Sequence, residues 1–173
     1  MSAKPAARVD YSFDSEGSGA TGKVDSGFEA ILERALRRGR EKGLDYAGEV
    51  TPREAWALFD AGAAILIDVR TRPEYELVGR VPDTPLVEWR RYGEALPNPA
   101  FIGELARHAT ARDTVLFLCR SAVRSHHAAE SAARAGYTQA FNVLQGFEGD
   151  LDANRQRGTR GGWRAAGLPW EQS

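Results

Sequence analysis

The chain has 173 residues, 42% of them hydrophobic, which is enough for one folded domain with a sizeable core. Its formal net charge of −1 excludes a general electrostatic attraction to nucleic acid or to an anionic membrane. No apolar stretch approaches membrane-spanning length, and the first residues lack the apolar run of a secretory signal. We therefore expect a cytoplasmic protein with neither nucleic-acid nor membrane partners.

The chain contains a single cysteine, Cys119, and this limits what that residue can do. It cannot form a disulfide within the chain, which fits a reducing compartment and leaves a buried core residue, a metal ligand or a reactive thiol. Metal binding is disfavoured because only three histidines are present and no second cysteine lies at ligand spacing. His126 and His127 are adjacent, so on a helix their side chains diverge by about 100°. We expect no metal and no cofactor.

The chain is expected to divide into three parts. Residues 1–26 are small, polar and rich in glycine and serine, which predicts a flexible tail. Residues 27–48 form a predicted helical extension, ended by Gly43, with one apolar face (Phe28, Ile31, Leu32, Ala35, Leu36). Residues 49–173 are expected to form the domain that carries the function.

A helix is predicted near the start of this domain, because Thr51 can cap it, Pro52 suits its first turn and Glu54 completes a capping box. Beyond it, short apolar runs alternate with helical segments. Strands are expected at 63–69, 114–119 and 140–144, with a possible strand at 85–89; helices are expected at 99–109 and 124–136. This alternation predicts an α/β domain with a mostly parallel central sheet flanked by helices.

Cys119 ends the second clear strand, at the edge where α/β sheets place their sites. The amide groups of the following turn and first helical turn have no partner within the helix, and the helix dipole adds positive potential there. Arg120 and Arg124 add two permanent charges, so the loop favours a thiolate over a thiol. The alternative reading, a small core cysteine, is disfavoured because Ser121 and the two arginines argue against an apolar pocket.

Four segments resemble the rhodanese family of sulfurtransferases. "CRSAVRS" resembles the family's active-site loop, commonly Cys-Arg-x-Gly-x-Arg-Ser/Thr. "LIDVRTRPEYELVGRVPDT" resembles its earlier Asp-x-Arg segment, "AGYTQAFNVLQGF" its Gly-Tyr…Leu-x-Gly-Gly segment and "WRAAGLPW" its usual ending. The order and spacing of these motifs agree over roughly Thr51 to Trp170.

The resemblance implies a three-layer rhodanese-like fold and a sulfurtransferase in which Cys119 attacks a donor such as thiosulfate and becomes a persulfide. A thiol or cyanide, or a protein acceptor, would then remove the sulfur. The loop that follows the cysteine would bind the substrate, with both arginines holding the anionic donor (Arg120, Ser121, Ala122, Val123, Arg124, Ser125). Asp68 and Arg70 would support this loop, although a structural ion pair beside the sheet explains them equally well.

The sequence departs from the family pattern at three places. Ala122 stands where glycine is common; if that position needs a positive φ, alanine costs about 1 kcal/mol. Arg80 stands where histidine is frequent, with little expected effect on the reaction. Residues 150–160 look like an insertion, which either overhangs the active site or forms a solvated loop.

Three other functions remain to be weighed. A cysteine phosphatase uses Cys-x5-Arg, whereas Cys119 and Arg124 are separated by four residues, so the loop is one residue too short for a tetrahedral phosphate. A non-enzymatic persulfide carrier or interaction module would deliver sulfur to a protein partner, with the helix from Phe28 to Gly43 as a docking element. Packing on the domain's own surface explains the amphipathic pattern of this helix more simply. A Cys–His hydrolase is disfavoured because His126 and His127 lie on a helix running away from the thiol.

Overall fold

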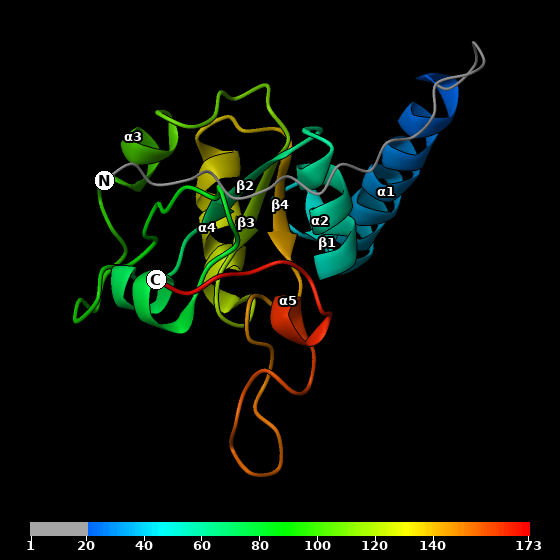
Figure 1. The fold of residues 1–173 in the computed structure, drawn as a ribbon. Coiled ribbons are helices and arrows are strands. Elements are labelled where there is room, and N and C mark those ends of the chain that lie inside the picture. The colour runs from blue at the N-terminus through cyan, green and yellow to red at the C-terminus, as the bar shows by residue number, and fades with distance from the viewer. Residues whose placement is uncertain (1–20) are drawn as a thin grey trace, which may run out of the picture.

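The computed structural model describes residues 21–173 of the chain (Figure 1). Most of the predicted tail therefore lies outside the described residues, but its end belongs to the first helix, which starts earlier than expected because no proline interrupts it. The elements in chain order are α1 (Thr21–Lys42), β1 (Gly48–Val50), α2 (Pro52–Asp60), β2 (Ile65–Asp68), a π-helix η1 (Glu74–Val78), α3 (Phe101–Leu105), β3 (Val115–Leu118), α4 (Val123–Arg134), β4 (Ala140–Val143) and α5 (Gly162–Ala165).

The sheet has four parallel strands in the order β1-β4-β3-β2, which confirms the predicted α/β class. All residues of β3 and β4 are buried. Their nearly continuous apolar runs follow from this burial, since helices cover both faces of a parallel sheet. The carboxyl ends of β2, β3 and β4 meet at one edge, and the loops that leave this edge form the candidate site.

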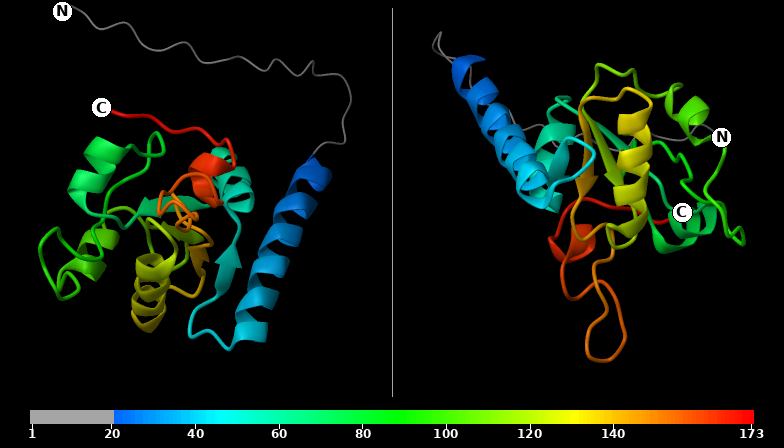
Figure 2. Two further views of the ribbon diagram at one scale, coloured as in Figure 1. Left: turned by 90° about the horizontal axis from the view of Figure 1, so that it is seen from below. Right: turned by 180° about the vertical axis from the view of Figure 1, so that it is seen from behind.

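Helices pack on the two faces of the sheet and create two apolar cores (Figures 1 and 2). On the face of α3 and α4, Phe117 packs with Phe101 and with the alanines of α4, whose small side chains allow a close approach. On the face of α1, α2 and α5, Phe141 and Trp163 are fully buried. Successive β3 residues alternate between the two cores, as the pleat of a strand requires.

Several elements differ from the prediction, among them α3, which is shorter than the helix expected at 99–109. Residues 85–89 form no strand; only an isolated bridge joins Leu86 to Asp68. Strand β1 was not predicted, because "GEV" is short and carries a charge. Helix α4 begins at Val123, since Ala122 lies in the left-handed region just before it. The capping box at Thr51 is present as predicted.

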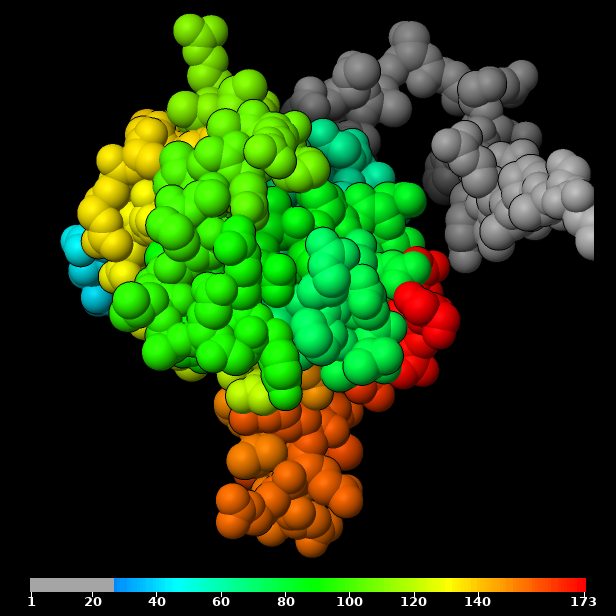
Figure 3. Space-filling model, turned by 90° about the vertical axis from the view of Figure 1, so that its left-hand side faces the viewer, coloured from blue at the N-terminus to red at the C-terminus, as the bar shows by residue number. Residues whose placement is uncertain are grey.

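The predicted insertion at residues 150–160 projects from the body of the protein as a separate lobe (Figure 3). A bridge between Asp150 and Arg160 closes its base, and the Arg157 guanidinium donates to the Gly149 carbonyl. Within the described chain, no hydrogen bond joins this lobe to residues 119–125. It is a solvent-exposed loop at the sheet edge. No helix in residues 21–173 is long and apolar enough to cross a membrane.

Candidate active site

Cys119 follows β3 directly, at the centre of the carboxyl edge of the sheet. Neighbouring strands β2 and β4 flank it, and the side chain is a free thiol with 1% of the residue exposed. The strand therefore delivers one sulfur to the floor of the loop that leads into α4. The cysteine lies at the end of a strand, as predicted, but its side chain is buried and belongs to the apolar core on the face of α3 and α4, which differs from the expectation.

The backbone amides that surround this sulfur are left unpaired. In the part of the chain that the structure describes, none of the amides from Arg120 to Ser125 donates a hydrogen bond to another residue. The first bond of α4 runs from the His126 amide to the Ala122 carbonyl. Unpaired amides at the start of a helix form a site of positive potential, which stabilises an anion.

Ala122 gives the loop its turn. Its φ of 72° and ψ of −4° lie in the left-handed region, so this position does need a positive φ. A non-glycine residue pays about 1 kcal/mol for this conformation. Alanine therefore occupies a conformation that glycine adopts without strain.

Arg124 is held by a carboxylate that the sequence analysis did not single out. Its two terminal nitrogens donate to the two oxygens of Glu74, both at 2.7 Å. Burial alone would raise the pKa of Glu74, but hydrogen bonds from Arg124 and from the Thr71 amide lower it to about 2. The Thr71 hydroxyl donates to the same carboxylate, so the spacing Thr-x-x-Glu is the sequence signal that could have identified it.

Arg120 differs from Arg124 because it is exposed. It lines a surface pocket of about 270 Å³ beside the loop, together with Arg90, Tyr92 and Thr71. Among residues 21–173, neither Arg90 nor Arg120 forms an ion pair, so both charges face the pocket without a carboxylate partner. Arg90 was not predicted as a site residue.

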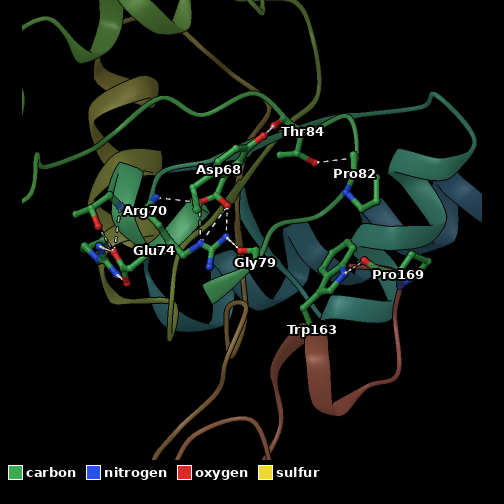
Figure 4. Close-up of polar contacts among 11 residues, drawn as sticks. Asp68, Arg70, Glu74, Gly79, Pro82, Thr84, Trp163 and Pro169 are labelled. Atoms are coloured by element: carbon green, nitrogen blue, oxygen red, sulfur yellow. Dashed lines mark hydrogen bonds and ion pairs between the residues drawn. The ribbon is translucent and has the colours of Figure 1, made fainter. Parts of the chain in front are cut away.

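Asp68 and Arg70 form an ion pair with both side chains fully buried (Figure 4). The Arg70 amide and Nε donate to Asp68 Oδ1, and Nη2 donates to Asp68 Oδ2 at 2.6 Å and to the Gly79 carbonyl at 2.7 Å. The guanidinium also lies 4.1 Å from the centre of the Phe147 ring. No hydrogen bond in the described chain joins this pair to residues 119–125, so its geometry is that of a structural ion pair beside the sheet.

The match to known families accords with this geometry. The model of the rhodanese-like domain matches residues 51–153, which is more than half of the chain. The protein belongs to the rhodanese-like domain family. An uncharacterized protein of Rickettsia conorii is 33% identical over 114 residues, covering 62% of this chain and 83% of the relative.

Two further proteins are similar to this rhodanese-like protein. The crystal structure of Rv0390 from M. tuberculosis is 47% identical and superposes with a TM-score of 0.65, covering 74% of this chain and 99% of that one. The thiosulfate sulfurtransferase GlpE of Actinobacillus pleuropneumoniae is 24% identical over 129 residues, covering 71% of this chain and 92% of the relative. The recognition from sequence is thus confirmed at the level of the family.

The turn after β4 holds the cysteine loop of the rhodanese-like domain by backbone hydrogen bonds. The Phe147 amide donates to the Cys119 carbonyl at 2.7 Å, and the Glu148 amide donates to the Arg120 carbonyl at 2.9 Å. Gly146 lies so close that a Cβ there would be 2.4 Å from the Cys119 carbonyl oxygen. Its φ of 64° also favours glycine. Both the close backbone contact and the positive φ therefore require glycine at this position.

Ser125 is the one side chain that the structure joins to the sulfur by a hydrogen bond, among the residues described. Its Oγ lies 3.1 Å from Cys119 Sγ and 2.7 Å from Asn142 Oδ1 of β4. The Asn142 amide nitrogen in turn donates to Glu49 Oε1 of β1 at 3.3 Å. Asn142 and Glu49 were not predicted, because only the strand register brings them to the cysteine.

The two histidines of α4 are directed away from the thiol. His126 Nδ1 lies 2.7 Å from the Tyr46 hydroxyl, and both rings lie within 3.4 Å of the Glu130 carboxylate. Both rings contact Glu130. One possible metal-ligating atom of each histidine and one of Glu130 lie within 4.8 Å of one another, so the two rings are closer together than was predicted from their divergence on the helix. No described hydrogen bond joins either ring to Cys119, so a Cys–His pair is not formed.

Proposed function

We propose that the protein is a sulfurtransferase that moves a sulfane sulfur from a small anionic donor, such as thiosulfate, to a thiophilic acceptor through a persulfide on Cys119. The observation that carries this proposal is the loop itself, in which a lone thiol sits beneath the unpaired amides from Arg120 to Ser125. Such a ring of donors stabilises the negative charge of a thiolate, of a bound anion and of a persulfide alike.

The first step forms one sulfur–sulfur bond and breaks another. The Cys119 thiolate attacks the outer sulfur of thiosulfate, and sulfite leaves with the electron pair of the broken bond. The outer sulfur of the resulting persulfide carries the negative charge and lies among the loop amides. The attacking species in this scheme is the thiolate, so no base has to remove a proton during the attack.

The cations of the site have separate tasks in this scheme. Arg124 is committed to Glu74, so it fixes the entrance of the loop and lends the site only part of its charge. The donor's sulfonate oxygens are met by Arg120 and Arg90, the two arginines that face the pocket without a carboxylate partner. This assignment changes the prediction from sequence, in which Arg120 and Arg124 shared the donor.

The second step returns the enzyme to its starting state. A nucleophilic acceptor, either cyanide or a thiol, attacks the outer sulfur, and the bond to Cys119 Sγ breaks with its electron pair returning to the thiolate. Each turnover therefore passes through one covalent intermediate. A reducing compartment such as the cytoplasm would supply thiol acceptors. The thiosulfate sulfurtransferase GlpE among the relatives supports this choice of donor.

The proposal is tested by the mass of the intact protein after incubation with thiosulfate. We expect a gain of one sulfur atom that dithiothreitol removes, and no gain in Cys119→Ala. Release of many thiocyanates per Cys119 in excess thiosulfate and cyanide would distinguish an enzyme from a passive carrier, because a carrier releases its one bound sulfur only once. Absence of any sulfur gain with thiosulfate and with polysulfide would overturn the proposal.

A further inference from the structure

A chain of buried hydrogen bonds runs from the cysteine to the amino-terminal helix. It passes from Cys119 through Ser125 and Asn142 to Glu49, and Glu49 Oε2 is paired with the Lys42 ammonium of α1. The Ser125 and Asn142 residues are 0% and 2% exposed, and Glu49 is 5% exposed. Lys42 and Glu49 precede residue 51, so they lie outside the segment that matches the rhodanese family.

The donor and the acceptor in each of these hydrogen bonds can be assigned from which groups carry a proton. An ionised carboxylate only accepts, so Asn142 must turn its NH2 group toward Glu49 and its carbonyl oxygen toward Ser125. The Ser125 hydroxyl has one proton. Asn142 Oδ1 can only accept, so its 2.7 Å contact with Ser125 Oγ requires that proton, whereas the sulfur at 3.1 Å can, as a thiol, donate to the same oxygen. The sulfur is then left facing an oxygen lone pair.

The negative charge on Glu49 maintains this arrangement of donors and acceptors. The Lys42 ammonium binds its carboxylate, and the Arg38 guanidinium donates to its backbone carbonyl at 2.9 Å. The neighbouring Tyr46 hydroxyl stays neutral, because burial and the Glu49 charge raise its pKa. Arg124 is the cation that faces Cys119 from the other side, and it is held by Glu74.

We propose that Glu49 is a positioning residue that holds the Ser125 proton on Asn142 and so withholds a hydrogen bond from the Cys119 thiolate. A thiolate that accepts fewer hydrogen bonds forms at a higher pH but attacks sulfur faster once formed, because nucleophilicity rises with basicity. The amino-terminal extension thereby sets the balance between the amount of thiolate and its reactivity. This inference rests on the proposed function only in taking Cys119 as the reacting group.

Glu49→Gln tests the direction of the chain. A glutamine can donate as well as accept, so the Asn142 amide is free to turn over and the Ser125 proton is released to the sulfur. We expect the midpoint of thiolate formation, followed by ultraviolet absorbance, to fall by about 0.5–1 pH unit. Above that midpoint, the rate of reaction with iodoacetamide is expected to fall roughly two- to threefold. Cys119→Ala provides the blank for tyrosine absorbance.

Three further variants keep the test decisive. Glu41→Gln removes the same charge from the exposed surface of α1 and is expected to change neither quantity. Ser125→Ala removes the shared proton, so Glu49→Gln is expected to have no further effect in that background. Asn142→Leu offers a second way to free the Ser125 proton, with the same direction of change, should Glu49→Gln not fold.

Two results would overturn the inference. One is a midpoint that stays in place or rises in the folded Glu49→Gln or Asn142→Leu protein, which is what a purely structural role predicts. The other is a shift that persists without Ser125. Neither measurement uses a sulfur donor, so a failure here is distinct from a failure to form the persulfide.

Discussion

The loops that follow β2 and β3 leave the same sheet edge side by side, but they differ in whether their polar groups have hydrogen-bond partners within the protein. After β2, the side chains of Asp68, Arg70, Thr71 and Glu74 bond to one another and to nearby backbone. After β3, the amides from Arg120 to Ser125 have no partner in the described chain. The polar side chains of the first loop bond to the protein itself, apart from the buried Arg70 Nη1, whereas the second loop keeps its amide donors for a ligand.

The two loops meet at one contact, the ion pair between Glu74 and Arg124. Through this ion pair the β2 loop fixes the entrance of the β3 loop, whose amides have no partner. An open ring of donors needs such external support, because it lacks the internal bonds that would hold its own shape. The comparison predicts that removing the bonded side chains of the β2 loop acts mainly on stability, whereas removing the thiol or the unpaired donors of the β3 loop acts on sulfur chemistry.

The largest expected effect is that of Asp68→Asn. It leaves the fully buried Arg70 guanidinium without its counter-ion, which typically destabilises a protein by about 3–5 kcal/mol. Denaturant unfolding measures this loss, with the exposed Asp60→Asn as the control. The folded fraction should still load sulfur with thiosulfate. A loss of loading without a loss of stability would break the division between the two loops.

An intermediate effect is expected for Glu74→Gln, and it depends on pH. The pKa of Glu74 is lowered from 4.5 to about 2, so its ionised form stabilises the fold above pH 4.5, and this stabilisation is lost as pH falls toward 2. We expect the variant to be less stable by about 2 kcal/mol at neutral pH, with the difference closing in acid. Unfolding curves from pH 2 to pH 7 measure it.

The control for that series is Glu76→Gln, which removes an exposed carboxylate paired with Arg72. Exposed pairs of this kind contribute about 0.5 kcal/mol or less. A Glu74→Gln difference that stayed constant across the acid range would show that the loss arises from packing and not from the ion pair with Arg124.

The smallest expected effect is that of Ala122→Gly, in the β3 loop. Glycine adopts the observed φ of 72° without strain, so we expect a gain in stability of about 0.5–1 kcal/mol. Thermal unfolding measures the gain. Ala135→Gly is the control, because its φ is −86° and glycine there only adds flexibility to the unfolded chain. Destabilisation by Ala122→Gly would mean that the alanine methyl makes a contact that outweighs the strain.

Much of the fold could be predicted because its signals are local. The apolar runs that became β2, β3 and β4, the capping box at Thr51 and the position of Cys119 all depend on neighbours in sequence. The strand expected at 85–89 is absent because strand formation also depends on pairing with a distant segment. The apolar residues at 85–89 favour a strand, but within the sheet their backbone bonds only to Asp68 and Val69 at the end of β2, which gives one isolated bridge and no ladder.

The missing parts of the candidate site depend on contacts between distant segments. The ion pair of Arg124 could not be predicted, because nothing near it in the sequence shows that Glu74, 50 residues earlier, binds its guanidinium. Asn142 and Glu49 were missed because a polar residue inside a strand is recognised as functional only when the register of β1 and β4 is known. The family resemblance named the loop residues but not these partners.

Strand β1 ends at Val50, one residue before the family match begins, yet it forms an edge of the sheet. It covers β4 through bonds such as that from the Leu144 amide to the Val50 carbonyl. A fragment cut at the family boundary would leave β4, with its apolar side chains, as a bare edge open to pairing with another chain. The smallest aggregation-resistant unit of this protein therefore begins upstream of the domain by which it is recognised.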